Sequence, residues 1–234
     1  SAAAILIVLA LLLPLVYLII RAAGSTPDHW AKLLTPRFLE TLGRSLLLAG
    51  TVTGASILIG TTLAWLTTRT DLPARRLWGI LAAVPLAIPS YVGSFALVAT
   101  FGPRGLLTQR LTPLMGVNEI PEIYGFPGAW FALTLYSYPY VYLIVRATIT
   151  RLDPALEEAA RSLGDRPSRI LWRIVVPQLR PAIVSGGLLV MLYALSDFGA
   201  VVMLRYTTLT RAIYTQYTAS FDRTGAALQA LPKA

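Results

Sequence analysis

Uncharged apolar runs of membrane-spanning length alternate with short charged segments along this chain. Four runs carry no charged residue, and they cover residues 2–20, 45–68, 77–103 and 123–145. A fifth run, residues 181–204, contains a single acid, Asp197. A helix needs about 20 mostly apolar residues to cross the hydrocarbon core of a bilayer. The pattern therefore predicts five membrane-spanning helices.

The two ends of the chain are interpreted from the same pattern. The first run lacks the basic start and the small-residue cleavage site of a removable signal peptide, so we expect a retained helix. Residues 224–232 are uncharged but too few to span, although Ala226, Ala227 and Leu228 suit the beginning of another helix. The chain starts with Ser1 rather than Met. We expect a piece of a longer chain, cut near the start of a sixth helix.

Residues 146–180 form a charged segment between the fourth and fifth runs, and its first half predicts a short helix. Asp153 suits a helix N-cap, and Pro154 suits the first helical position. Residues 156–160 are mostly good helix formers, and Gly164 supplies a helix stop. We therefore expect a helix from Pro154 that ends before Gly164.

The second half of this segment predicts another helix, which opens at Pro167. Its apolar residues fall at the spacing of one helical stripe: Ile170, Leu171, Ile174 and Val175. Pro177 and Pro181 are expected to kink or end it. Seven arginines occur in the whole segment: Arg146, Arg151, Arg161, Arg166, Arg169, Arg173 and Arg180. A loop buried in lipid could not carry that charge, so we predict a docking surface outside the bilayer.

Composition supports the same class of protein. Apolar residues make up 56% of the chain and charged residues only 13%, which departs from the usual composition of a soluble domain. We expect an all-α membrane protein, a polytopic helical bundle that forms one transmembrane domain over residues 1–234. Small residues should allow its helices to approach closely: Gly50, Gly54, Ala55, Gly60, Ser185, Gly186 and Gly187.

The basic residues beside the runs predict the orientation of the chain. The segments 69–76 and 146–180 together hold ten basic residues in 43 positions. The segments 21–44, 102–122 and 205–223 hold nine in 64 positions. Because basic residues favour the cytoplasmic side, this bias places the N-terminus and residues 146–180 in the cytoplasm. It also explains the net charge of +9 without nucleic acid, for which no basic patch interleaved with aromatics occurs.

The charged segment also resembles a known family. Glu158, Ala159 and Ala160, then Gly164, then Ile174 and Val176-Pro177 are similar to the pattern E-A-A, three residues, G, nine residues, I-x-L-P of ABC importer permeases. The chain departs from it only in Val176, where Leu is usual. The resemblance implies that this loop forms the coupling helix that docks on a dimeric ATPase subunit. The ATPase-coupling residues are then Glu157, Glu158, Ala159, Ala160, Gly164, Ile174 and Pro177.

Other stretches are similar to the permeases of ferric-iron importers. They are Pro85-Leu86-Ala87-Ile88-Pro89-Ser90-Tyr91-Val92, Tyr138-Pro139-Tyr140-Val141-Tyr142, Leu195-Ser196-Asp197-Phe198-Gly199-Ala200, Leu204-Arg205-Tyr206, Ala212-Ile213-Tyr214-Thr215-Gln216-Tyr217 and Ser220-Phe221-Asp222-Arg223. The resemblance implies transport of ferric iron delivered by an external binding protein, across the bacterial cytoplasmic (inner) membrane. Thiamine, phosphonate, sulfate and polyamine remain alternative substrates, and a non-transporting structural subunit is a further alternative. A second permease unit, fused or separate, is implied as well.

Five residues are candidates for the translocation path or its gate: Pro85, Pro89, Tyr138, Pro139 and Asp197. Prolines inside spans break the backbone hydrogen-bond ladder, which membranes tolerate beside protein or water, although simple kinking for packing is an equal alternative. Asp197 is an acid within a run, and such a group is by default a functional hypothesis. It either gates the path or pairs with an arginine such as Arg205. We favour these two roles over direct binding of iron.

Several chemistries are disfavoured by the sequence. No phosphate-binding loop of the GxxxxGKS/T type occurs, so ATP must be hydrolysed by a separate subunit and the chain itself is not expected to be an enzyme. We expect no cofactor and no resident metal, because Cys is absent and His29 is the single histidine. An intramembrane serine protease needs a histidine base within the spans, and His29 lies in a loop.

Overall fold

A computed structural model describes residues 8–10, 12–13, 16–17, 35–103, 105–109 and 123–219. It divides into two compact units, residues 1–42 and residues 43–234. In the first unit, helical pieces of the predicted run 2–20 are described, and the rest of that run lies outside the described residues. The predicted start of a sixth helix at 224–232 lies outside them as well. All regular elements of the described residues are helical, which confirms the all-α part of the predicted fold class.

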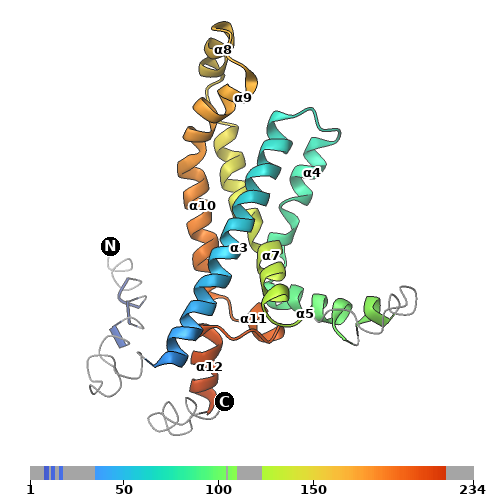
Figure 1. Ribbon diagram of the computed structural model, residues 1–234, viewed down its shortest axis with the longest axis vertical. Helices are drawn as coiled ribbons and strands as arrows, with labels where there is room; N and C mark the ends of the chain where they lie inside the picture. Colours follow the sequence, from blue (N-terminus) through green and yellow to red (C-terminus); the bar gives the residue numbers. More distant parts are fainter. Residues whose placement is uncertain are drawn as a thin grey trace. The chain divides into compact units, whose positions relative to one another are not determined.

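Figure 1 shows the helices of the described residues in chain order. Their bounds are α3 (Pro36–Arg69), α4 (Arg75–Leu81), the 3-10 helix η1 (Val84–Ala87), α5 (Ser90–Phe101), α7 (Phe126–Ile149), α8 (Pro154–Ser162), α9 (Pro167–Ile170), the π-helix η2 (Leu171–Val175), α10 (Val176–Ser196), α11 (Gly199–Met203) and α12 (Leu209–Ala219).

Two helical stretches among the described residues are long and apolar enough to cross a membrane. They are Pro36–Arg69, with 34 residues, and Pro167–Ser196, with 30 residues. The number rises to three when a bent helix pair is taken as one span. α7 has 24 residues and the required length, but its tyrosines and prolines lower its apolar character. The predicted count of five spans is therefore not confirmed, whereas the membrane-spanning helical character is.

The third predicted run is broken rather than straight. α4 and η1 occupy its first part, and the helix that begins at Ser90 is inclined to them by 97° (Figure 1). Pro85 lies in η1, and Pro89 is the N-cap residue of α5. A proline has no backbone N–H and restricts the residue before it, so two prolines four residues apart interrupt the helix here. The predicted break at these prolines is confirmed, and a single continuous helix over 77–103 is wrong.

Pro177 and Pro181 were expected to kink or end the helix, and of these two effects an end is wrong. α9, the π-helix η2 and α10 follow without interruption, and Pro181 lies inside α10. Pro177 is the second residue of α10, directly after the π-helix η2. The Gln178 side chain lies along the same turn, where its Nε2 donates to the carbonyl of Ile174 at 3.0 Å. The segment after Gly164 thus continues directly into the last long span.

α7 carries a large share of the buried residues, and α3 and α10 pack against it. A Cβ on Gly60 of α3 would lie 2.9 Å from both the carbonyl oxygen of Tyr138 and the nitrogen of Tyr142. A Cβ on Gly186 of α10 would lie 3.1 Å from the Cα of Val141. The predicted close approach at Gly60 and Gly186 is confirmed, because backbone meets backbone there.

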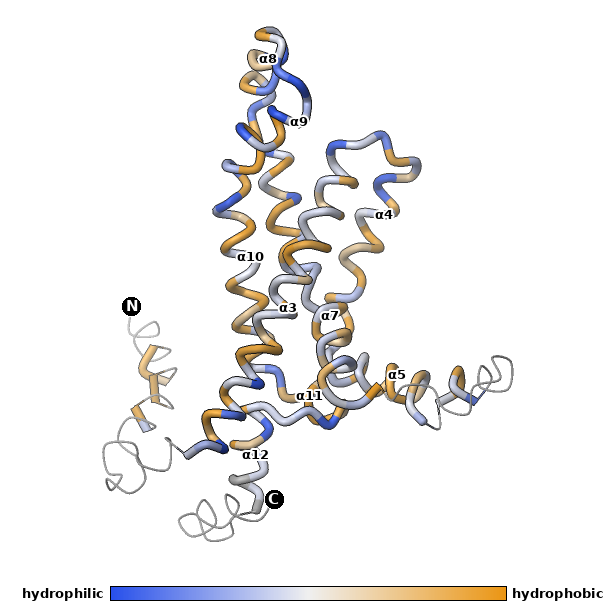
Figure 2. The backbone as a smooth tube through the Cα atoms, viewed as in Figure 1, coloured by the Kyte–Doolittle hydropathy of each residue, from blue (hydrophilic) through white to orange (hydrophobic). Residues whose placement is uncertain are grey.

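Polarity separates along the helices (Figure 2). Apolar residues dominate the length of α10, whereas hydrophilic residues gather around α8 and α9 and in the turn between α3 and α4. This distribution fits a bundle that lies in lipid along its length and meets water at the end that carries α8. The elements at this end are therefore accessible to a water-soluble partner.

Candidate functional site

The start of α8 is set by its own sequence. The Oδ1 atom of Asp153 accepts a hydrogen bond from the backbone N–H of Ala155 at 2.9 Å, and Pro154 occupies the first turn. This satisfies one of the N–H groups that a helix start leaves without a partner. The predicted N-cap is confirmed.

Gly164 ends α8 in a conformation that other residues resist. Its φ is +85°, and the N–H of Asp165 donates to the carbonyl of Ala160 at 3.1 Å, as in a Schellman motif. A Cβ at Gly164 would meet nothing within 4 Å, so space does not select glycine here. The left-handed backbone does, because a side chain there clashes with the following carbonyl oxygen. The predicted stop is confirmed together with its cause.

Two faces of α8 differ in exposure. Leu156, Ala159 and Leu163 recur at a helical spacing of three and four residues and all are exposed, with Leu163 at 86%. We call these three residues the outer stripe. Glu157 and Ala160 form the inner face and are buried. Because exposed apolar residues in a charged, water-facing segment are characteristic of a docking surface, the outer stripe is a candidate contact for another protein.

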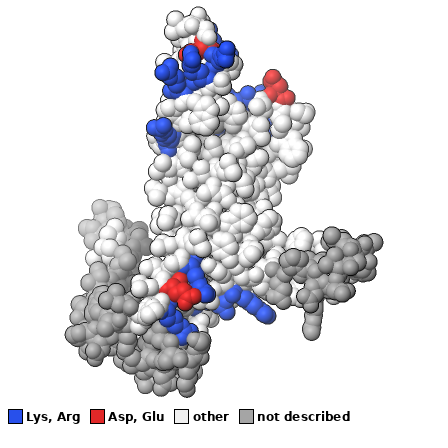
Figure 3. Space-filling model, in the orientation of Figure 1, with Lys and Arg blue, Asp and Glu red and all other residues white. Residues whose placement is uncertain are grey.

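A basic collar surrounds the outer stripe. Six of the seven predicted arginines are exposed: Arg151, Arg161, Arg166, Arg169, Arg173 and Arg180. Figure 3 shows basic side chains gathered over α8 and α9. Arg169 Nη1 pairs with Asp165 Oδ1 at 2.9 Å. The collar presents a positive field around an apolar centre, which would attract a partner with acidic rims.

The predicted coupling residues occupy three different places. Glu158 and Ala159 are exposed on α8, whereas Glu157 and Ala160 face inward. Glu157 Oε1 lies 2.9 Å from Arg69 Nη2 at the end of α3, close enough for an ion pair but without the alignment of a hydrogen bond.

Ile174 and Pro177 lie half-buried where η2 joins α10. The structure therefore does not place them on the outer stripe, although they belong to the same sequence pattern. They lie in the stretch that links α9 to the long span, not on α8 itself.

Asp197 lies at the other end of α10, outside the helix and not within it. α10 ends at Ser196, and Asp197 has an extended backbone. Its Oδ1 accepts from the N–H of Ala200 at 2.8 Å, and its Oδ2 accepts from the hydroxyl of Ser90. The carboxylate thus joins the start of α11 to the start of α5. The expected pairing with Arg205 is wrong, because Arg205 stacks over the ring of Tyr124 at 4.5 Å.

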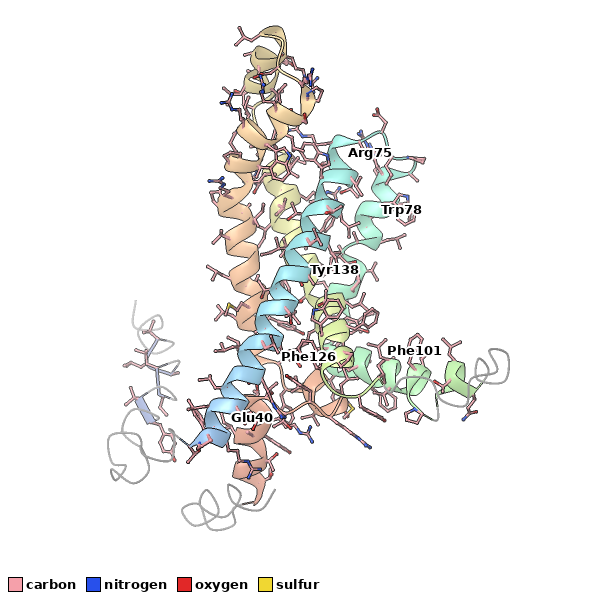
Figure 4. The ribbon with its side chains drawn as sticks, in the orientation of Figure 1. Glu40, Arg75, Trp78, Phe101, Phe126 and Tyr138 are labelled. Atoms are coloured by element: carbon pink, nitrogen blue, oxygen red, sulfur yellow. The ribbon has the colours of Figure 1, made fainter. Side chains whose placement is uncertain are left out.

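The remaining path candidates do not form one site with Asp197. Tyr138 is buried on α7 (Figure 4), and its carbonyl lies against Gly60 of α3. Pro139 is also fully buried in α7. Pro89 directly precedes Ser90, whose hydroxyl donates to Asp197. A role of these residues in a path stays a prediction.

The sequence analysis did not single out three residues that make important contacts in the structure. The structure pairs Arg69 with Glu157 and Ser90 with Asp197, and these contacts give the two residues their importance. Tyr142 is completely buried; its hydroxyl donates to the carbonyl of Gly79 at 3.0 Å and accepts from Arg146 Nη1 at 2.9 Å. The single sequence signal for this cluster was the spacing of four residues between Tyr142 and Arg146.

Two substitutions of Asp197 distinguish its role as a hydrogen-bond acceptor from the role of its negative charge. In Asp197→Ala, Ser90 and the N–H of Ala200 lose their acceptor, and we expect a stability loss of about 1–3 kcal/mol and less protein in the membrane. Asp197→Asn keeps the acceptor for Ala200, and Ser90 can rotate, so protein level and substrate uptake should both stay near the native values. Uptake lost in Asp197→Asn at an unchanged protein level would show that the negative charge itself is required.

Comparison with known proteins assigns the chain. The family model described as "Binding-protein-dependent transport system inner membrane component" matches residues 56–231. The chain belongs to this family. By that description its members are inner-membrane components of binding-protein-dependent transport systems.

Curated relatives of this permease transport different ions. The Fe(3+)-transport system permease protein FbpB 2 of Haemophilus influenzae is 37% identical over 225 residues, which is 96% of this chain and 41% of the relative. The sulfate transport system permease protein CysT of Escherichia coli is 30% identical, with 84% of this chain and 70% of the relative covered. The molybdenum transport system permease protein ModB of Mycobacterium tuberculosis is 30% identical, with 80% and 69% covered. This permease chain thus spans less than half of its ferric-iron relative.

Solved structures support the fold. A bacterial alginate ABC transporter, crystallised with a pentasaccharide-bound periplasmic protein, matches with a TM-score of 0.69 and 17% identity over 97% of this chain and 86% of the other. An inward-facing methionine ABC transporter matches with a TM-score of 0.61 and 17% identity over 87% and 88%. At this identity the likeness concerns the arrangement of helices, which is that of ABC transporter permeases.

Proposed function

We propose that this permease is the transmembrane subunit of an ATP-driven importer that moves ferric iron delivered by an external binding protein. The observation that carries the proposal is α8, a capped helix whose apolar outer stripe is exposed at the water-facing, basic end of the bundle. A helix that projects an apolar face into water needs a partner to cover it. In an importer of this family that partner is the ATPase subunit.

Ferric iron is favoured over other substrates because the ferric relative is the more similar one. It shares 37% identity over 96% of this chain, whereas the sulfate and molybdenum relatives share 30% over 84% and 80%. Sulfate and molybdate are the principal alternatives, followed by thiamine, phosphonate and polyamine. The ferric relative is more than twice as long as the matched region, which supports a second permease unit, fused or separate, as a further partner.

The proposed cycle uses both ends of the bundle. A loaded binding protein docks on the outer loops near residues 24–44, 104–122 and 205–223, which lie partly outside the described residues. On the cytoplasmic side, ATP closes the dimeric ATPase against the outer stripe of α8. α8 is joined through Gly164 and α9 to α10, so its displacement can tilt the long span and open the path outward. The protein then works in the bacterial cytoplasmic membrane.

The proposal is tested by uptake of radiolabelled ferric iron into cells that carry or lack the complete gene. Radiolabelled sulfate and molybdate serve as parallel substrates in the same cells. We expect gene-dependent accumulation of iron and no gene-dependent accumulation of the two oxyanions. Gene-dependent sulfate or molybdate uptake with indifferent iron uptake would keep the permease and replace its substrate. Indifference to all substrates, thiamine, phosphonate and polyamine included, would contradict the transport function itself.

A further inference from the structure

We propose that Arg69 and Glu157 are positioning residues that carry the movement of α8 to α3. This inference rests on the proposed docking of an ATPase at α8 and adds a second route from α8 into the bundle, beside the chain connection to α10. Glu157 precedes the E-A-A residues of the family pattern, and its place on the inner face gives it a different task from the exposed Glu158.

α8 is held to the bundle at its buried inner face, where Glu157 and Ala160 lie, and by its neighbour α9, which packs against it. The turns around Asp153 and Gly164 join the two ends of α8 to α7 and α9. The ion pair between Glu157 and Arg69 joins the inner face of α8 to the end of α3.

The ion pair between Arg69 and Glu157 is short and largely shielded from water. The atoms lie 2.9 Å apart, and the side chains of Arg69 and Glu157 are only 25% and 11% exposed. A pair at this depth is screened less by water and salt than a surface pair, and removal of one partner leaves a charge without compensation. Arg69 is also in the last turn of α3, where the helix dipole favours a cation. Both partners are therefore held in place before any partner protein binds.

α3 links Arg69 to the centre of the bundle. α3 packs on α7 through Gly60, with the bond between Ser56 and Ser137 nearby at 3.2 Å, so α3 and α7 meet as close rigid bodies. A displacement of Arg69 consequently moves α3 as a rigid body, because tight packing leaves side chains little room to rearrange. The pair therefore joins α8 to α3, while the chain joins α8 through α9 to α10.

The test is a distance measurement in the complete transporter. The chain contains no cysteine, so spin labels can be attached at Ser162→Cys on α8 and Leu66→Cys on α3 without further changes to this subunit. In the otherwise native complex we expect one narrow distance that is the same with and without ATP. In Glu157→Gln we expect a distribution at least about twice as broad that shifts on addition of ATP, because α8 moves without α3.

Two further variants decide the interpretation. The exchange Arg69→Glu with Glu157→Arg should restore the narrow distance and return transported iron per ATP hydrolysed to within about twofold of native, whereas each single change should lower that ratio about fivefold or more, as expected for a coupling interaction. Asp165→Asn is the matched control, because it removes an exposed ion pair of the same segment that does not reach α3. It should leave the distance unchanged.

The inference is overturned if Glu157→Gln gives the native distance in both states, or if the distance already shifts with ATP in the native complex. The same holds if the charge exchange behaves like the single variants. A failure of the proposed function looks different, since the ATPase subunit would then not copurify with the native chain at all.

Discussion

Gly164→Val should lower substrate uptake by about fivefold to thirtyfold while the protein still inserts into the membrane. The backbone at Gly164 has a φ of +85°, which a side-chain-bearing residue adopts at a cost of about 1–2 kcal/mol, and each 1.4 kcal/mol changes a population tenfold. Valine is branched at Cβ and falls at the upper end of that range. The turn that sets the angle between α8 and α9 would thus be the minority conformation, and the outer stripe would no longer face the ATPase.

Two controls separate the backbone conformation from the added side chain. Gly54→Val also places its Cβ in open space, but in an ordinary stretch of α3, so its effect on uptake should be small. Gly164→Asn should retain most of the uptake, because asparagine tolerates the left-handed region better than other residues. Uptake and membrane protein level are measured together. Native uptake by a stably inserted Gly164→Val variant would remove α8 from the coupling mechanism.

Gly60→Leu should prevent assembly of the bundle. A Cβ at this position would already lie 2.9 Å from the carbonyl oxygen of Tyr138 and from the nitrogen of Tyr142, both backbone atoms of α7. Backbone atoms of a packed helix cannot move aside as a flexible side chain can, so α3 and α7 must separate. Overpacking of this kind costs about 1–3 kcal/mol for added methylenes, and a leucine adds several groups. We expect little detergent-stable protein by size-exclusion chromatography.

The same helix supplies the matched comparison. Gly60→Ala should lower the stability of the purified protein, whereas Gly54→Ala should leave it unchanged or raise it by about 0.5–1 kcal/mol, because nothing lies within 4 Å of Gly54 and alanine favours the helix. Thermal unfolding of the two variants in detergent measures the difference. Equal stabilities would mean that α3 and α7 are not in backbone contact at Gly60.

Features governed by neighbouring residues in the sequence could be predicted. The cap at Asp153 and the left-handed turn at Gly164 depend on the side chain and φ of one residue, and both are present. The break at Pro85 and Pro89 is equally local. The membrane-spanning helical character followed from hydropathy in the same way, since lipid acts on every exposed residue alike.

Features that depend on distant partners could not be predicted. Ser90 and Asp197 are 107 residues apart, and nothing near either residue in the sequence indicates the other. The pair of Arg69 with Glu157 joins two segments that the apolar pattern treats as separate loops. At Pro177 and Pro181 the sequence left a kink and an end open, and the helix continues past both, from the π turn through α10.

Site-directed cross-linking tests most directly whether this chain is a permease driven through α8. A photoactivatable maleimide reagent is attached at Leu163→Cys, whose native side chain is 86% exposed on the outer stripe, in a chain without other cysteines. Leu188→Cys on the exposed side of α10 serves as the control. We predict a cross-link from position 163 to the ATPase subunit and none from position 188. Absence of the first cross-link in an assembled complex that hydrolyses ATP would contradict the assignment of α8 as the docking helix.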